Sequence, residues 1–149
     1  MSPNRFLRDL IVVLICAGCA IWGVTRWLVR PFIVSGPSMQ PTLYDGDRVL
    51  VDLTALKQRL PRPGELVVLL GPDDVDLVKR VAREPYPANA PYPEAAIAAD
   101  SQLEPCFIVL GDNPSESLDS RAFGRIPQHR IQGRVIWRYW PLTRLGSIE

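Results

Sequence analysis

Fifteen prolines, spread from Pro3 to Pro141, are the feature that most limits the fold of this 149-residue chain. Proline lacks a backbone N–H and interrupts helices, and in sheets it is confined to edges, turns and bulges. The proline pattern therefore argues against long soluble helices. It favours short strands that are joined by turns.

The N-terminal region contains an apolar run without charged residues from Leu10 to Val24. As a helix this run would extend roughly 22 Å, which is short of the ~30 Å hydrocarbon core of a bilayer. Extension to Val29 reaches the usual span if the Arg26 side chain lies at the membrane interface. We therefore predict a single transmembrane helix within an anchor over residues 1–30. A cleaved secretory signal is the alternative, and the basic residues on either side are tied in number, so charge sets no orientation.

Charge and cysteine content argue against several classes of protein. The 17 basic residues nearly balance the 16 acidic ones, so we expect no nucleic-acid partner. Cys16 and Cys19 lie within the apolar run, and Cys106 stands alone. A single C-x-x-C is weak evidence for a metal site, so we expect thiols within the membrane segment, no disulfide framework, and no metal or other cofactor. We also expect a monomer.

Short apolar segments that are separated by turn residues predict the strands. These segments are residues 31–35, 48–51, 65–70, 75–82, 106–110 and 133–140, with one or two helical turns within 54–60. Residues 71–74 fit the loop of a hairpin, and residues 82–105, rich in Pro and Ala, predict a small irregular insert. The expected fold class is mainly β, with an antiparallel barrel-like or sandwich-like domain over residues 31–149.

Ser38 is the candidate nucleophile. Gly36 and Pro37 precede it and Met39 follows, so its hydroxyl would project from a constrained loop between a strand and a proline turn. An ordinary turn serine would have the same surroundings, and Ser38 alone does not decide between the two.

Lys79 is the candidate general base. On a strand it shares one face with Leu77 and Val81, and an ammonium on an apolar face loses hydration, which lowers the pKa of Lys79. A neutral amine can then accept the proton of a serine hydroxyl. The alternative is a strand lysine whose end reaches solvent. His129 is the single histidine, so a Ser-His-Asp enzyme would have to use it, whereas a Ser-Lys protease would not.

Small polar residues dominate the segment from Gly111 to Arg121, directly after a predicted strand. Such a segment suits a loop that hydrogen-bonds to itself and orients a neighbouring side chain, although a plain solvent-exposed loop has a similar composition.

Taken in order, these segments resemble type I signal peptidases, the membrane-bound Ser-Lys proteases that remove signal peptides. After the N-terminal anchor, the resemblance rests on residues 35–43, 46–51, 64–68, 78–81, 111–121 and 133–142. It implies that Ser38 is the nucleophile, that Lys79 is the general base and that Ser117 orients the lysine. It also implies a structural ion pair and a bracing loop, formed respectively by Asp119 with Arg121 and by Asp112 with Asn113.

The resemblance implies cleavage of secreted precursors after small residues at −1 and −3, on the extracytoplasmic side of the inner cell membrane. The expected partners are signal-peptide-bearing precursors and membrane lipid. Apolar residues just after the anchor would line the substrate pocket or rest on the bilayer: Phe32, Ile33 and Met39. Gly36 stands where relatives often have a serine or threonine, so the backbone N–H of Ser38 is the surest oxyanion donor.

Three other functions stay open. The first is a dedicated maturation protease of the same family, of the kind that trims nickel superoxide dismutase. The second is a self-cleaving Ser-Lys repressor, which the apolar N-terminus argues against. The third is a catalytically inactive, membrane-anchored binding module.

Overall fold

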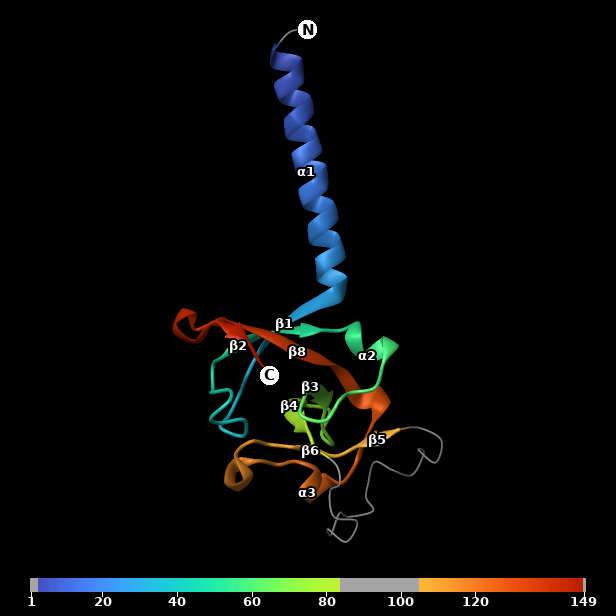
Figure 1. Ribbon diagram of the computed structural model, residues 1–149, viewed down its shortest axis with the longest axis vertical. Helices are drawn as coiled ribbons and strands as arrows, with labels where there is room; N and C mark the ends of the chain where they lie inside the picture. The colour runs from blue at the N-terminus through green and yellow to red at the C-terminus, as the bar shows by residue number, and fades with distance from the viewer. Residues whose placement is uncertain (1–2, 84–104, 149) are drawn as a thin grey trace.

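The structure is a computed structural model that describes residues 3–83 and 105–148 (Figure 1). A 26-residue helix, α1 (Pro3–Leu28), extends away from a domain that is built mainly of short strands. The strands are β1 (Val29–Ile33), β2 (Arg48–Asp52), β3 (Leu66–Leu70), β4 (Asp76–Val81), β5 (Cys106–Phe107), β6 (Val109–Leu110), β7 (Ile126–Pro127), β8 (Ile131–Trp140) and β9 (Gly146–Ser147). The short helices are α2 (Ala55–Gln58), α3 (Ser120–Phe123), η2 (Pro114–Glu116), η3 (Gln128–Arg130) and η4 (Leu142–Arg144).

The main sheet has the order β1-β2-β8-β3-β4-β6, with β9 paired to β8. Every pairing is antiparallel, which confirms the predicted mainly β, antiparallel class. Within the described residues β1 and β6 end the order and do not pair with each other, so the predicted closure into a barrel is not found. The predicted hairpin between β3 and β4 is present, with Leu70 opposite Asp76.

The predicted strand over residues 106–110 is wrong in one respect, because the chain divides it between two sheets. Cys106 and Phe107 pair with β7, whereas Val109 and Leu110 pair with β4. The first strand also lies earlier than predicted, at Val29–Ile33, because it pairs with β2 over that range. The predicted insert over residues 82–105 lies mostly outside the described residues.

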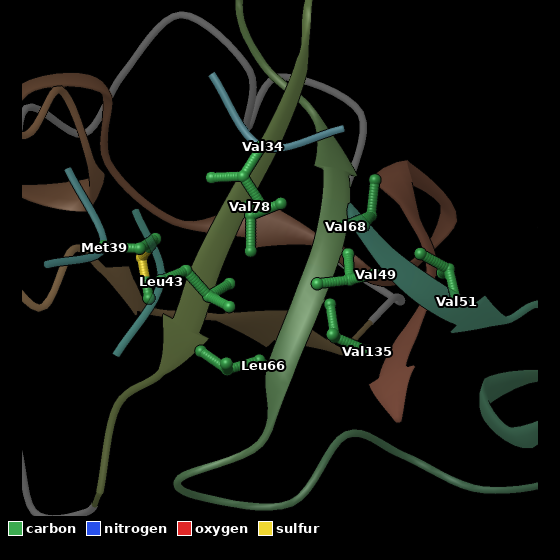
Figure 2. Packing of buried hydrophobic residues seen from close by; sticks show 9 residues of the cluster. All are labelled: Val34, Met39, Leu43, Val49, Val51, Leu66, Val68, Val78 and Val135. Carbon is green, nitrogen blue, oxygen red and sulfur yellow. The ribbon is translucent and has the colours of Figure 1, made fainter. Parts of the chain in front are cut away.

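Strand β3 separates two apolar clusters and is buried on both faces, as its uninterrupted apolar sequence predicts. Successive side chains of a strand point to opposite faces, so Val68 packs in one cluster and Val67 and Leu69 in the other. Figure 2 shows the first cluster, which consists of Val34, Met39, Leu43, Val49, Val51, Leu66, Val68, Val78 and Val135. Met39 and Leu43, in the loop that carries Ser38, belong to this cluster, which therefore fixes that loop against the sheet.

The side chains of α1 from Leu7 to Ala20 are exposed. None of the helices in the described part of the chain is both long enough and apolar enough to cross a membrane. The predicted transmembrane crossing is therefore not confirmed.

Candidate active site

Ser38 and Lys79 line the same cavity, which has a volume of about 90 Å³. Its walls come from the end of β1, the loop after β1 and the first half of β4. The three predicted substrate-binding residues, Phe32, Ile33 and Met39, all line this cavity. The fold thus brings together a serine, a lysine and small apolar walls that lie far apart in the sequence.

The loop that carries Ser38 is held at both ends. Gly36 has φ +84°, a left-handed conformation that glycine adopts without strain, and its N–H donates to Asp45 Oδ1 at 2.8 Å. On the other side of Ser38, the Met39 side chain is buried in the first cluster. Asn113 donates its backbone N–H to the Ser38 carbonyl at 3.0 Å and its side-chain amide to the Pro37 carbonyl at 3.3 Å. These contacts fix the backbone from which the Ser38 hydroxyl projects.

Lys79 is buried, with 2% of its surface exposed, so its end does not reach solvent. Leu77 and Val81, on the same face of β4, pack in the second apolar cluster, as the alternation along the strand predicts. The ammonium donates to Ser117 Oγ at 3.1 Å. Loss of hydration lowers the pKa of Lys79; the negative charge of Asp119 opposes this shift, and the positive charge of Arg121 adds to it.

Asp119 is fully buried and determines the direction of the hydrogen bonds around Lys79. Burial alone would raise the pKa of Asp119, but hydrogen bonds from Arg121, the Gly111 N–H and the Ser117 hydroxyl lower it to about 2. The carboxylate is therefore ionised and can only accept, so the Ser117 hydroxyl donates to Asp119 Oδ2 at 2.8 Å. Ser117 Oγ in turn accepts from Lys79. Because Lys79 donates to Ser117 and Ser117 donates to Asp119, an N–H of the lysine points at Ser117. The lone pair of a neutral Lys79 amine can then face another group.

Arg121 holds this carboxylate in place. Its guanidinium donates to both carboxylate oxygens of Asp119, at 2.8 and 2.5 Å, and its backbone N–H donates to Oδ1 at 3.1 Å. Asp119 is thereby also the N-cap of α3. The geometry matches the ion pair that the sequence resemblance implied.

A second ion pair connects β4, which carries Lys79, to the loop that carries Ser38. Arg80, which follows Lys79, donates to both carboxylate oxygens of Asp112 at 2.8 Å. Thr42, in the loop after Ser38, donates to Asp112 Oδ2 at 2.6 Å. Burial raises the pKa of Asp112, but the bonds from Arg80 and Thr42 outweigh this effect and lower it. Asp112 therefore links β4, the loop that carries Ser38 and the polar loop from Gly111 to Arg121. Nothing in the sequence indicated that Thr42 takes part in this contact.

Gly111 packs so closely that no side chain fits. A Cβ on this residue would lie 2.1 Å from Ser117 Oγ and 2.7 Å from the Ser38 carbonyl oxygen. Its N–H donates to Asp119 Oδ2 at 2.8 Å. Close approach of β6, Ser117 and the Ser38 loop thus depends on glycine at this position.

A family of known proteins matches most of this chain. The family described as "Signal peptidase, peptidase S26" matches residues 7–85 and 101–140, which include Ser38, Lys79 and the segment from Gly111 to Arg121. The chain belongs to this family. Signal peptidase membership confirms the resemblance seen in the sequence and makes the protein a peptidase.

Two relatives illustrate the breadth of the signal peptidase match. Signal peptidase IB of Staphylococcus aureus (strain Mu50) is 29% identical over 177 aligned residues, covering 94% of this chain and 93% of the relative. Mitochondrial inner membrane protease subunit 1 of Xenopus tropicalis is 31% identical over 136 residues, covering 89% of this chain and 81% of the relative. The first alignment is longer than this 149-residue chain, so that relative carries residues that this chain lacks.

Asp76 has no signal in the sequence, and Ser35 stands there only as one residue of the segment 35–43. Both line the cavity because the end of β1 and the loop after it face β4 across it. His129 lies in η3 and is not among the cavity residues. Within residues 3–83 and 105–148, no group of three or more His, Cys, Asp or Glu side chains could hold a metal ion.

Proposed function

We propose that the protein is a serine endopeptidase that uses a Ser38–Lys79 dyad to remove signal peptides from secreted precursors. The observation that carries the proposal is the buried Lys79, which is held by Ser117 in the same cavity as Ser38. A lysine with a lowered pKa reaches its neutral, basic form at lower pH than an exposed lysine does. The family assignment supports the same chemistry.

The proposed reaction is acyl transfer. Ser38 Oγ attacks the scissile carbonyl carbon while the neutral Lys79 amine takes the hydroxyl proton. The resulting ammonium gives this proton to the leaving amine, and the neutral amine then activates a water molecule that releases the acyl group from Ser38. The backbone N–H of Ser38 stabilises the oxyanion, and Ser35, one of the cavity-lining residues, is the candidate for a second donor. Ser117 and the Asp119–Arg121 pair keep the amine lone pair directed away from Ser117.

The cavity supports a preference for small side chains at −1 and −3. A volume of about 90 Å³ leaves little room beside Ser38, and Phe32, Ile33 and Met39 give it apolar walls. β6 pairs with β4 only at Arg80 and Val81, so the edge of β4 before Lys79 carries no strand within the described residues. An extended peptide can add to such an edge through backbone hydrogen bonds. We propose that the substrate lies as a strand between β1 and β4.

We further propose that α1 holds the protein at the membrane. Large apolar side chains are exposed along the helix, among them Leu10, Val13, Leu14 and Ile15. In water this apolar surface would be costly, whereas in lipid it would be stable. Alkaline carbonate extraction and protease protection of intact cells measure the predicted inner-membrane location and extracytoplasmic orientation. Release of the whole protein by carbonate would refute anchoring through α1.

The central test uses the full chain in detergent with a signal-bearing precursor. We expect cleavage by the native protein, and loss of cleavage in Ser38→Ala and in Lys79→Ala, while His129→Ala keeps its activity. Circular dichroism of each variant controls for folding. Full activity in a folded Ser38 or Lys79 variant would refute the dyad, and loss of activity in a folded His129 variant would favour a triad.

A dedicated maturation protease differs from a general signal peptidase in the number of its substrates. Depletion of the protein followed by identification of N-termini across the secreted proteins separates the two. Many uncleaved precursors support general processing, and a single uncleaved precursor supports the dedicated role. An inactive binding module would leave every N-terminus unchanged.

A further inference from the structure

A cluster of polar side chains joins β1 to β4, although these strands are not neighbours in the sheet. In the strand order β2, β8 and β3 lie between them. Arg30 of β1 nevertheless donates to Asp76 Oδ2 of β4 at 2.9 Å. Gln132 of β8 completes the cluster, since it accepts from Arg30 at 3.1 Å and donates to Asp76 Oδ1 at 2.5 Å. This ion pair therefore bridges the gap in which the substrate strand is proposed to lie.

The bridge lies at the end of the gap that is remote from the nucleophile. Four antiparallel pairings separate β1 from β4, so the two strands run in the same direction. Arg30 and Asp76 are near the beginnings of these strands, whereas Ser38 follows β1 and Lys79 lies further along β4. Asp76 precedes Lys79 by three positions, which at ~3.3 Å per residue is a distance of about 10 Å along the strand. A peptide strand parallel to both would fit about three residues between the scissile bond and the bridge.

Both charged side chains of the bridge can be reached from solvent. The Arg30 side chain is 48% exposed and that of Asp76 is 28% exposed, and Asp76 also lines the cavity. Because the two opposite charges are paired, the bridge presents little net charge to a passing peptide. Removal of either partner would leave a single unpaired charge at the same place.

We infer that the Arg30–Asp76 bridge is a specificity element that contacts the fourth substrate residue upstream of the scissile bond, position −4. This inference rests on the proposed function, since it requires a peptide in the gap between β1 and β4. The native bridge accepts basic, neutral and acidic residues at −4 about equally, because its own charges compensate each other. The part of the gap between Ser38 and the bridge then holds substrate residues −1 to −3, and the bridge is the upstream end of this part.

Two single variants test this assignment, because it predicts opposite charge preferences at −4 for them. Three peptides are used that differ only by Lys, Gln or Glu at −4. Arg30→Gln leaves the Asp76 carboxylate unpaired and should favour Lys over Glu in kcat/KM, whereas Asp76→Asn leaves Arg30 unpaired and should favour Glu over Lys. We expect ratios of about threefold to fivefold, the size typical of a partly exposed charge pair, and a decrease of these ratios in high salt. The native enzyme should show a ratio within about twofold.

Asp74→Asn is the matched control, because Asp74 lies in the same β3–β4 turn region and pairs with Arg130 at 2.7 Å, outside the cavity. This variant should keep the native Lys-to-Glu ratio of kcat/KM. The double variant Arg30→Glu with Asp76→Arg, in which the two charges are exchanged, should also keep it. Thermal unfolding identifies any variant that fails to fold, and the other single variant then carries the test.

The outcomes separate this inference from the proposed function. Opposite charge preferences at −4 in the two variants support it. The inference is overturned if both folded variants show the same Lys-to-Glu ratio of kcat/KM, or if their charge preference appears at another substrate position. In either case, cleavage by the native enzyme leaves the peptidase assignment intact. Failure of the native enzyme to cleave any peptide overturns both.

Discussion

Replacement of Gly111 by alanine tests whether the site depends on close backbone packing. The added Cβ would lie 2.1 Å from Ser117 Oγ, 2.5 Å from Ser117 Cβ and 2.7 Å from the Ser38 carbonyl oxygen. Ordinary contacts are at least 3.4 Å, so Ser117 or the Ser38 loop must move by about 1 Å. The φ of Gly111 is not in the left-handed region, so alanine introduces a steric clash without backbone strain.

The displaced groups are those that would orient the base and present the nucleophile. A misplacement of about 1 Å lowers kcat by roughly a hundredfold, and forced overpacking costs about 1 to 3 kcal/mol of unfolding free energy. Both quantities are measured, kcat with a fluorogenic signal-peptide substrate and unfolding free energy by urea titration. Gly146→Ala is the control, since a Cβ there meets nothing within 4 Å. Native kcat in a folded Gly111→Ala enzyme would show that close packing at Gly111 is not needed to position Ser38 and Ser117.

Three further predictions concern ionisation and bracing. First, kcat/KM should rise with pH as Lys79 loses its proton, with a midpoint below that of an ordinary lysine because burial lowers its pKa; a pH–rate profile that is flat up to the ordinary lysine pKa would contradict this. Second, Asp119 has its pKa lowered from 3.8 to about 2, so the unfolded state binds more protons between these values. It therefore contributes roughly 2 kcal/mol of stability above pH ~4 that is lost as the pH falls towards 2, and urea titrations should show a weaker acid dependence in Asp119→Asn. Third, Arg80→Lys loses the bidentate contact with Asp112, so we expect a drop in kcat and a lower Tm, with a coupling of about 1 to 3 kcal/mol in a double-mutant cycle with Asp112→Asn. Additive effects of the two substitutions would show that the pair does not brace the site.

Much of the fold could be predicted because the relevant signals are local. The turn residues and apolar runs located β2, β3, β4 and β8 within about two residues, since strand formation here follows short periodic patterns. The division of residues 106–110 between two sheets could not be predicted. It depends on the partners β7 and β4, and no pattern within these five residues specifies a partner strand.

At the candidate site, too, some features could be predicted from the sequence and others could not. Lys79 on an apolar strand face predicted a buried amine with a lowered pKa, because burial follows from the alternation of side chains along one strand. The cavity that Lys79 shares with Ser38, and the bridge from Arg30 to Asp76, depend on the approach of β1 to β4. The direction of the hydrogen bonds from Lys79 through Ser117 likewise depends on an ionised, buried Asp119.

The family, the antiparallel β class and the candidate nucleophile and base could all be identified from the sequence alone. These follow from ordered motifs and from strand periodicity, both of which can be read along the chain. The folded structure was needed to show which residues face one another, that Gly111 must lack a side chain, and that Arg30 and Asp76 are in contact. These properties depend on distances between strands that are remote in sequence, and such distances are set when the apolar clusters on the two faces of β3 pack.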